Sequence, residues 1–238
     1  CINVDDSAYS ANNWTVVGGY IDSQHYFSAD CASLFTTDVP DINFETYLEA
    51  NGMGNGVSGD KLVFTSNINT IQYLQVSNLN INTLEGIEDF ASLQYLDCSN
   101  NNLTNLNVSH NTQLLNLKCF GNHLTSLNVS NNTLLDYLSV KDNDLLRLDI
   151  TNNSFLTVLD CSDNKLISLF LENNSQIYWI ACENNKLLFL DVSSLSSLVT
   201  LTCQGNLLTS LDLRNGNCMN FVSQNPTNPH YSPALDTR

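Results

Sequence analysis

The chain of 238 residues has few basic side chains: 8 Lys and Arg stand against 24 Asp and Glu, so the formal net charge is −16. Nucleic acids and anionic membrane surfaces are bound through clustered Lys and Arg. The charge balance therefore argues against both as partners. Charged residues of either sign make up only 13 % of the chain, about half the usual share of a globular domain. Asn, Ser and Thr supply the missing polarity.

Long hydrophobic runs are also missing. No stretch approaches the roughly 18 apolar residues of a membrane-spanning helix, so we expect no insertion into a membrane. No secretion signal opens the chain, and if the protein is secreted we expect its signal to have been removed. The motifs of serine hydrolases, zinc proteases, phosphate-binding loops and dinucleotide-binding folds are absent. The sequence therefore predicts no enzyme, no cofactor and no metal site.

A period of 21 residues runs through most of the chain. Residues 93–113 read L-x-x-L-x-C-x-x-N-x-L-x-x-L-x-V-x-x-N-x-x, and the same unit recurs in register six times. The first asparagine keeps its place in every unit, whereas Val140 replaces one of the cysteines. The two columns are Asn101, Asn122, Asn143, Asn164, Asn185 and Asn206, and Cys98, Cys119, Cys161, Cys182 and Cys203.

This unit matches the leucine-rich repeat, whose period is about 20–29 residues. Leu96 and Cys98 alternate inward around Asp97, as a short parallel strand requires. Stacking of successive coils then builds a sheet on one wall of a solenoid. The second half of each unit repeats the alternation, which predicts further short strands on the opposite, convex wall. Each unit carries an asparagine where the chain leaves the first strand, able to satisfy backbone groups that have no strand partner.

Upstream of the repeats, Pro40 and Asp41 precede an apolar pattern that predicts a short amphipathic helix ending at Gly52. An open solenoid end exposes its core, so a capping element is expected there. We therefore expect a mainly β leucine-rich repeat solenoid with short parallel strands on its concave and convex walls and a small helical N-terminal cap. The expected ranges are a cysteine-bracketed segment over 1–37, the cap over 38–66, the solenoid over 67–216 and a C-terminal cap or tail over 217–238.

At these residues the chain resembles bacterial internalin-type leucine-rich repeat proteins, including the secreted or surface proteins of flavobacterial-type bacteria. The resemblance covers about residues 38–216 and lies in the cap, the segment LEGIEDF at 84–90 and the 21-residue unit with its cysteine ladder. It implies a secreted or cell-surface protein that binds host or environmental partners through variable surface residues. Residues 1–31 look like the segment that closes repeat arrays in such proteins. Here they precede the array. Either these residues form an N-terminal module, or the chain is a middle slice of a longer protein.

The ladder cysteines are predicted to be reduced, buried and structural. Side chains on neighbouring parallel strands point the same way, which fits disulfide geometry poorly. Stacked thiols also cannot surround a metal ion tetrahedrally. Val140 indicates that the position needs a small apolar group rather than a thiol. Cys1 and Cys31 bracket a compact segment and are the candidates for a disulfide, while Cys218 has no evident partner.

The side chains that point out of the predicted concave sheet are the candidates for binding. Exposed aromatics beside isolated charges are typical of a binding surface, although aromatics on a sheet can also serve only to stabilise their cross-strand neighbours. At one corner of adjacent coils, Asp142 and Asp163 are interpreted as solvated turns rather than a calcium site, because Ca²⁺ prefers six to eight oxygens. The predicted ligand-binding residues are Tyr73, Tyr95, Lys118, Phe120, Tyr137, Lys141, Asp160, Trp179 and Glu183.

Two carboxylates in this set have a predicted spacing that would suit a hydrolytic pair. Asp160 and Glu183 are expected roughly 8 Å apart from strand spacing and rise, inside the window of inverting glycosidases. An open sheet neither excludes water nor raises the pKa of an acid, which argues against this activity. The sequence instead predicts a monomeric, non-enzymatic recognition or adhesion module, secreted or on the cell surface, that binds a protein on its concave face. The alternatives are a glycan stacked on Tyr95, Tyr137 and Trp179, and a structural spacer in a longer surface protein.

Overall fold

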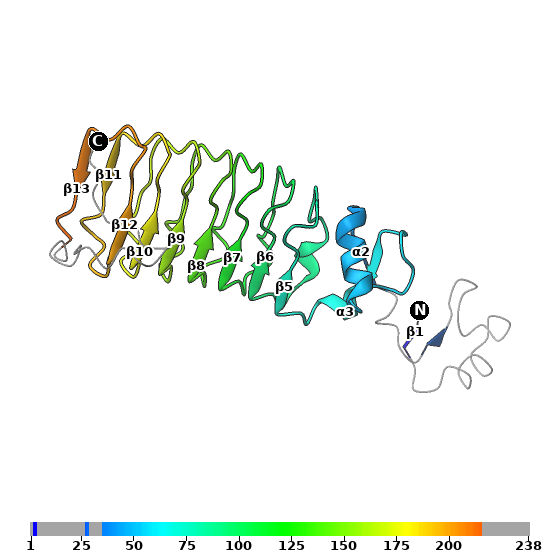
Figure 1. Cartoon of the computed structure of the whole chain (residues 1–238). Helices are drawn as coiled ribbons and strands as arrows, with labels where there is room; N and C mark the ends of the chain where they lie inside the picture. Colours follow the sequence, from blue (N-terminus) through cyan, green and yellow to red (C-terminus); the bar gives the residue numbers. More distant parts are fainter. Residues whose placement is uncertain (1, 4–26, 29–34, 216–238) are drawn as a thin grey trace, which may run out of the picture.

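The computed structural model describes residues 2–3, 27–28 and 35–215, and the account below refers to these. It is an elongated solenoid in which successive coils stack side by side, with a helix at the N-terminal end of the stack (Figure 1). Cys1, Cys31 and Cys218 lie outside the described residues, as does the disulfide expected between the first two. Ahead of the cap, strand β1 (Ile2–Asn3) pairs in parallel with β2 (Phe27–Ser28).

The cap is built around one helix and one antiparallel strand pair. Strand β3 (Thr36–Asp38) pairs with β4 (Leu62–Phe64), helix α2 spans Ile42–Ala50 between them, and the short helix α3 spans Thr65–Ile68. Asp41 caps α2, since its Oδ1 accepts hydrogen bonds from the backbone N–H groups of Asn43 and Phe44. The helix ends just before Gly52, whose φ of 72° suits glycine. No helix among the described residues is long and apolar enough to cross a membrane.

The concave wall is one parallel sheet of seven strands, which confirms the predicted solenoid. Its order follows the chain, and each strand pairs with the next in the register of the repeat, so that Leu96 lies beside Leu117 and Leu117 beside Leu138. The middle residue of each strand is buried in the shared core. The strands are β5 (Tyr73–Gln75), β6 (Tyr95–Asp97), β7 (Asn116–Lys118), β8 (Tyr137–Ser139), β9 (Val158–Asp160), β10 (Trp179–Ala181) and β12 (Thr200–Thr202).

The convex wall has fewer strands than the repeat predicts. In the part of this wall that the structure describes, only β11 (Phe189–Asp191) and β13 (Ser210–Asp212) form a strand pair, and Asn107, Asn128 and Asp149 are joined by isolated bridges. Near the cap, a single turn of 3-10 helix, η2 (Ile87–Asp89), occupies the intervening wall. The inward alternation of apolar residues still holds in these coils, because the core side chains on this wall are buried. Burial of side chains, rather than backbone pairing, therefore defines most of the convex wall.

The ladder cysteines are free and buried. Burial raises the pKa of Cys119 to about 12 and raises the pKa of the other four thiols as well. Their side chains are thus neutral at physiological pH and act as small hydrophobic groups in the core.

Two asparagine ladders tie the coils together. In the first, formed by the column from Asn101 to Asn206, Asn164 accepts a hydrogen bond from the Leu145 N–H at 3.0 Å and donates to the Val140 carbonyl at 2.9 Å. The second ladder is formed by the last asparagine of the repeat unit, a role that the sequence pattern did not predict, and its members donate to carbonyls of the preceding coil. Each of the four is completely buried: Asn111, Asn132, Asn153 and Asn174.

Candidate functional site

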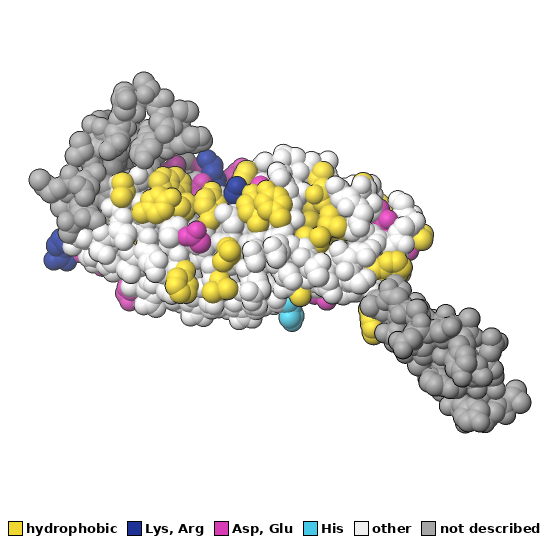
Figure 2. Space-filling view, turned by 90° about the horizontal axis from the view of Figure 1, so that it is seen from below, with side chains coloured by type: hydrophobic (Ala, Val, Ile, Leu, Met, Phe, Trp, Pro, Cys, Tyr) yellow, Lys and Arg dark blue, Asp and Glu magenta, His cyan; other side chains and the backbone are white. Residues whose placement is uncertain are grey.

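The strand register aligns the outward-pointing aromatic residues of the concave sheet. The first residues of successive strands from β5 to β10 pair directly with one another, and four of these six are aromatic. Figure 2 shows hydrophobic side chains along the long axis of the molecule, with charged side chains between them. The column contains Tyr73, Tyr95, Asn116, Tyr137, Val158 and Trp179.

The N-terminal part of this column is a packed cluster, called here the Tyr–Lys cluster (Tyr73, Tyr95, Lys118 and Tyr137). The rings of Tyr73 and Tyr95 stack with centroids 4.2 Å apart and planes within 10° of parallel. Lys118 lies between the next two rings, with its Nζ 5.3 Å from the Tyr95 centroid and 5.5 Å from the Tyr137 centroid. Both distances fall in the range of cation–π attraction. A cation therefore fits between two rings that are two coils apart.

The next part of the face is a groove of about 580 Å³, called here the central groove. It lies over β8, β9 and β10, where the short side chain of Val158 separates Tyr137 from Trp179. Five of the predicted binding residues line this groove. Tyr178 also lines it but was not among the predicted residues, because it precedes strand β10 and so lies outside the outward-pointing strand positions. The lining residues are Phe120, Tyr137, Ser139, Lys141, Val158, Asp160, Tyr178 and Trp179.

The carboxylates on this face have defined partners. Oδ1 of Asp160 accepts hydrogen bonds from the Ser162 hydroxyl at 2.6 Å and from its backbone N–H at 3.2 Å. Burial raises the pKa of Asp160, and the nearby Glu183 adds to the rise. The expectation that an open sheet leaves its acids unperturbed is thus wrong for Asp160, because its carboxylate is partly buried. Glu183 does not line the groove and accepts a hydrogen bond from the Thr202 hydroxyl.

The acidic corner of the coils has a backbone explanation. Asp142 and Asp163 belong to a column in which every residue has a φ between 51° and 68°, a conformation that favours Gly, Asn and Asp. Lys141 forms an ion pair with Asp163 at 3.5 Å. Within the residues that the structure describes, no group of three or more His, Cys, Asp or Glu side chains could hold a metal ion. The column comprises Asn100, Gly121, Asp142, Asp163, Asn184 and Gly205.

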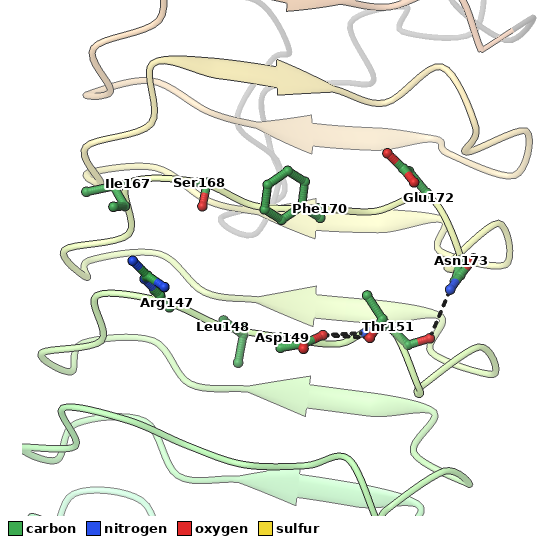
Figure 3. Close-up of a pocket in the computed structure, with 9 residues that line it drawn as sticks. All are labelled: Arg147, Leu148, Asp149, Thr151, Ile167, Ser168, Phe170, Glu172 and Asn173. Carbon is green, nitrogen blue, oxygen red and sulfur yellow. Dashed lines mark hydrogen bonds between the residues drawn. The ribbon is translucent and has the colours of Figure 1, made fainter.

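A second hollow of about 560 Å³ lies on the convex wall (Figure 3). Figure 3 shows Phe170 in the middle of it, beside Asp149 and Thr151 of the neighbouring coil, which are joined by hydrogen bonds. Five of the six coils carry Asn or Asp at the position of Phe170, and these side chains accept a hydrogen bond from the N–H two residues later. Phe170 cannot do so, and instead its exposed ring lies 6.4 Å from that of Phe189.

The fold and the repeat together define a leucine-rich repeat solenoid. No protein-family model and no curated protein matches the chain, but solved structures do. The functional domain of InlJ from Listeria monocytogenes, which includes a cysteine ladder, is 34 % identical over 75 % of this chain, with a TM-score of 0.69. This chain spans 40 % of that one.

Two further solved structures extend the comparison. The leucine-rich effector protein YopM from Yersinia pestis is 29 % identical over 59 % of this chain and 39 % of its own, with a TM-score of 0.51. The internalin InlF from Listeria monocytogenes is 19 % identical over 76 % of this chain and 65 % of its own, with a TM-score of 0.63, which supports the fold alone. These solved structures are internalin-type and other leucine-rich repeat proteins, and this chain is similar to them.

Proposed function

We propose that the chain is a non-enzymatic recognition or adhesion module that binds a protein partner through its concave face, as a monomer, outside the cell or at its surface. The observation that carries this proposal is the central groove, with Tyr137 and Trp179 as its walls and the Tyr–Lys cluster beside it. Binding energy in protein interfaces concentrates on half-buried aromatic anchors with a charged rim. The similarity to internalin-type proteins supports the same role, and the extracellular location is proposed on that similarity.

A protein partner is favoured over a glycan because some of the aromatic ring faces are already covered by other side chains. A sugar ring needs an open aromatic face on which to stack. Tyr73 covers the side of Tyr95 that faces β5, and Lys118 covers the side that faces β7 and also reaches Tyr137. Tyr95, the first of the three rings that would hold a glycan, is therefore covered on both sides by side chains of the chain itself, and Tyr137 is covered on the side that faces Lys118.

The test begins with a photo-crosslinking amino acid at Val158 on the groove floor, and a matched one at Ile167 on the convex wall. Each labelled chain is exposed to surface and secreted proteins from the producing cells and from their environment, and the crosslinked protein is identified by mass spectrometry. Titration of that protein against Trp179→Ala should show at least ~30-fold weaker binding, because a truncated hot spot costs ~2 kcal/mol or more, and Trp179→Ala together with Tyr137→Ala should abolish binding. The melting temperature should stay nearly unchanged.

The matched control is the convex pair Phe170→Ala with Phe189→Ala, which should keep full affinity. If the convex pair abolishes binding and the concave pair does not, the wrong face has been assigned. A glycan array probed in parallel tests the alternative ligand: selective glycan binding that is lost with Trp179→Ala would replace the protein partner. Neutrality of every concave substitution would leave the structural spacer as the function.

A further inference from the structure

The Tyr–Lys cluster and the central groove are two versions of one arrangement. In both, two aromatic rings at the first positions of their strands are separated by one intervening coil. Tyr95 and Tyr137 lie on either side of β7, and Tyr137 and Trp179 lie on either side of β9. Because neighbouring parallel strands keep a constant spacing, the two ring pairs stand on strands that are equally far apart.

The intervening coil fills the two gaps differently. In the first gap it supplies Lys118, whose charged Nζ lies 5.3 Å and 5.5 Å from the two ring centroids. Two strands after Lys118, the register places Asp160 at the equivalent position. The second gap therefore contains a carboxylate where the first contains a cation. Val158 is short and leaves the space above it open as part of the groove. The second gap thus has aromatic walls and an acidic side, but no cation of its own between the rings.

The acid in this gap has capacity for a further partner. Both hydrogen bonds from Ser162 go to Oδ1 of Asp160, and among the described residues Oδ2 accepts none. One basic residue, Lys141, also lines the groove, but its Nζ pairs with Asp163 at the corner. The chain as a whole carries a net charge of −16, which favours association with a basic surface.

We infer that the gap between Tyr137 and Trp179 receives an arginine side chain of the partner protein, with its guanidinium between the two rings and its charge against Asp160. This rests on the proposed concave-face function and specifies the chemistry of the partner. Lys118 is the internal precedent, because it already makes the same contact one ring earlier. Arginine suits the gap since its flat guanidinium stacks on aromatic faces and offers paired donors to a carboxylate.

The test uses a small probe, N-acetyl-arginine methylamide, and its neutral isostere, N-acetyl-citrulline methylamide. Binding is followed by the indole N–H resonance of Trp179, assigned with a Trp14→Phe variant because the chain has two tryptophans. The arginine probe should give a saturable shift, and the citrulline probe should bind about tenfold more weakly. Asp160→Asn should weaken arginine binding about tenfold, while Lys141→Gln should strengthen it by removing a like charge.

Two variants keep this test independent of folding defects. Asp160→Lys repeats Lys118 at the equivalent place, so it should fold and should abolish probe binding by occupying the gap. Asp97→Asn is the matched control, because Asp97 accepts the same two hydrogen bonds from Ser99 that Asp160 accepts from Ser162 but lies outside the groove. It should leave probe binding unchanged. Equal binding of the two probes, or no effect of Asp160→Asn, would overturn the inference.

The crosslinked partner separates this inference from the proposed function. If the partner loses affinity with the concave aromatic pair but binds Asp160→Lys as tightly as the unmodified chain, the face is correct and the arginine assignment is wrong. If the arginine probe binds as expected while the partner is indifferent to the aromatic pair, the gap recognises arginine but the concave-face function is wrong. Loss of partner binding with both Asp160→Lys and the aromatic pair supports both.

Discussion

Removing one rung of the first asparagine ladder tests how the coils are held together. Asn164 is buried, and its side chain makes four hydrogen bonds. Its Oδ1 accepts from the Leu145 N–H at 3.0 Å, and its Nδ2 donates to the carbonyls of Val140, Cys161 and Ser162 at 2.9, 3.3 and 3.0 Å. Replacement by Ala removes all four at once without a change of charge.

The four partners are not affected equally. Each of the three carbonyls keeps another donor, which is the Nδ2 of Asn143, the Nδ2 of Asn185 or the N–H of Asp142. The Leu145 N–H has no other acceptor among the described residues and becomes a buried, unpaired donor. Such a group costs about 1–3 kcal/mol, and the weakened carbonyls add a fraction of one hydrogen bond. We therefore expect Asn164→Ala to lower the free energy of unfolding by about 2–3 kcal/mol.

Two neighbouring asparagines supply the controls. Asn152 is exposed and makes one bond of 3.3 Å to the Ser130 carbonyl, so Asn152→Ala should change the stability by less than about 0.5 kcal/mol. Asn153, in the second ladder, is completely buried, but the carbonyls it binds keep backbone donors and its own Oδ1 has no partner. Asn153→Ala should therefore fall between the other two. Urea melts followed by circular dichroism give the order, and a larger loss for Asn152 or Asn153 than for Asn164 would refute this account of the ladder.

The remaining predictions concern the buried thiols. Cys161→Val should cost no more than ~1.5 kcal/mol in a thermal or urea melt, because it is a near volume-conserving core change and the preceding coil already carries Val140 at this position; a cost above 3 kcal/mol would mean that the thiol itself is needed. Mass spectrometry without reduction should find no disulfide among the five ladder cysteines, and a bridge between any two of them would contradict the parallel stacking.

The fold could be predicted because a residue's position in the repeat determines two things: which residue of the next coil it lies beside, and whether its side chain points into the core or outward. Six copies of one unit align Leu96 with Leu117 and Leu138, and the alternation within each copy separates core from surface. The extent of the convex strands could not be predicted in the same way. Inward alternation is required by burial alone, and it holds in coils where the backbones on that wall do not pair.

The candidate face was only partly accessible from sequence. The columns placed Tyr95, Lys118 and Tyr137 on one surface, but spacing does not say that a flexible lysine lies between two rings rather than in water. The direction of the Asp160 pKa shift could not be predicted for a related reason, since it depends on how far the folded chain buries the carboxylate. The left-handed corner, by contrast, had a readable signal, because only Asn, Asp and Gly occur in its column.

The junction between the cap and the first coil should be sensitive to acid through Asp41. Its Oδ1 caps helix α2, while its Oδ2 accepts from the backbone N–H of Asn82 at 2.7 Å and of Thr83 at 3.3 Å, so one carboxylate joins the two parts. Burial alone would raise the pKa of Asp41, but the hydrogen bonds from Asn82, Phe44 and Asn43 outweigh it and hold the pKa below 3.8. A depressed pKa in the folded state contributes stability that is complete well above pH 3.8 and is lost as the pH falls through the folded pKa.

Asp41→Asn keeps the helix cap but presents an amide donor to the N–H groups of the first coil, and should lower the free energy of unfolding by about 1–2 kcal/mol at pH 7. Urea melts of both proteins from pH 7 to pH 2.5 should show this difference constant down to about pH 5 and shrinking below about pH 4. A difference that stays the same at pH 2.5 would mean that the charge of Asp41 does not hold the cap to the solenoid.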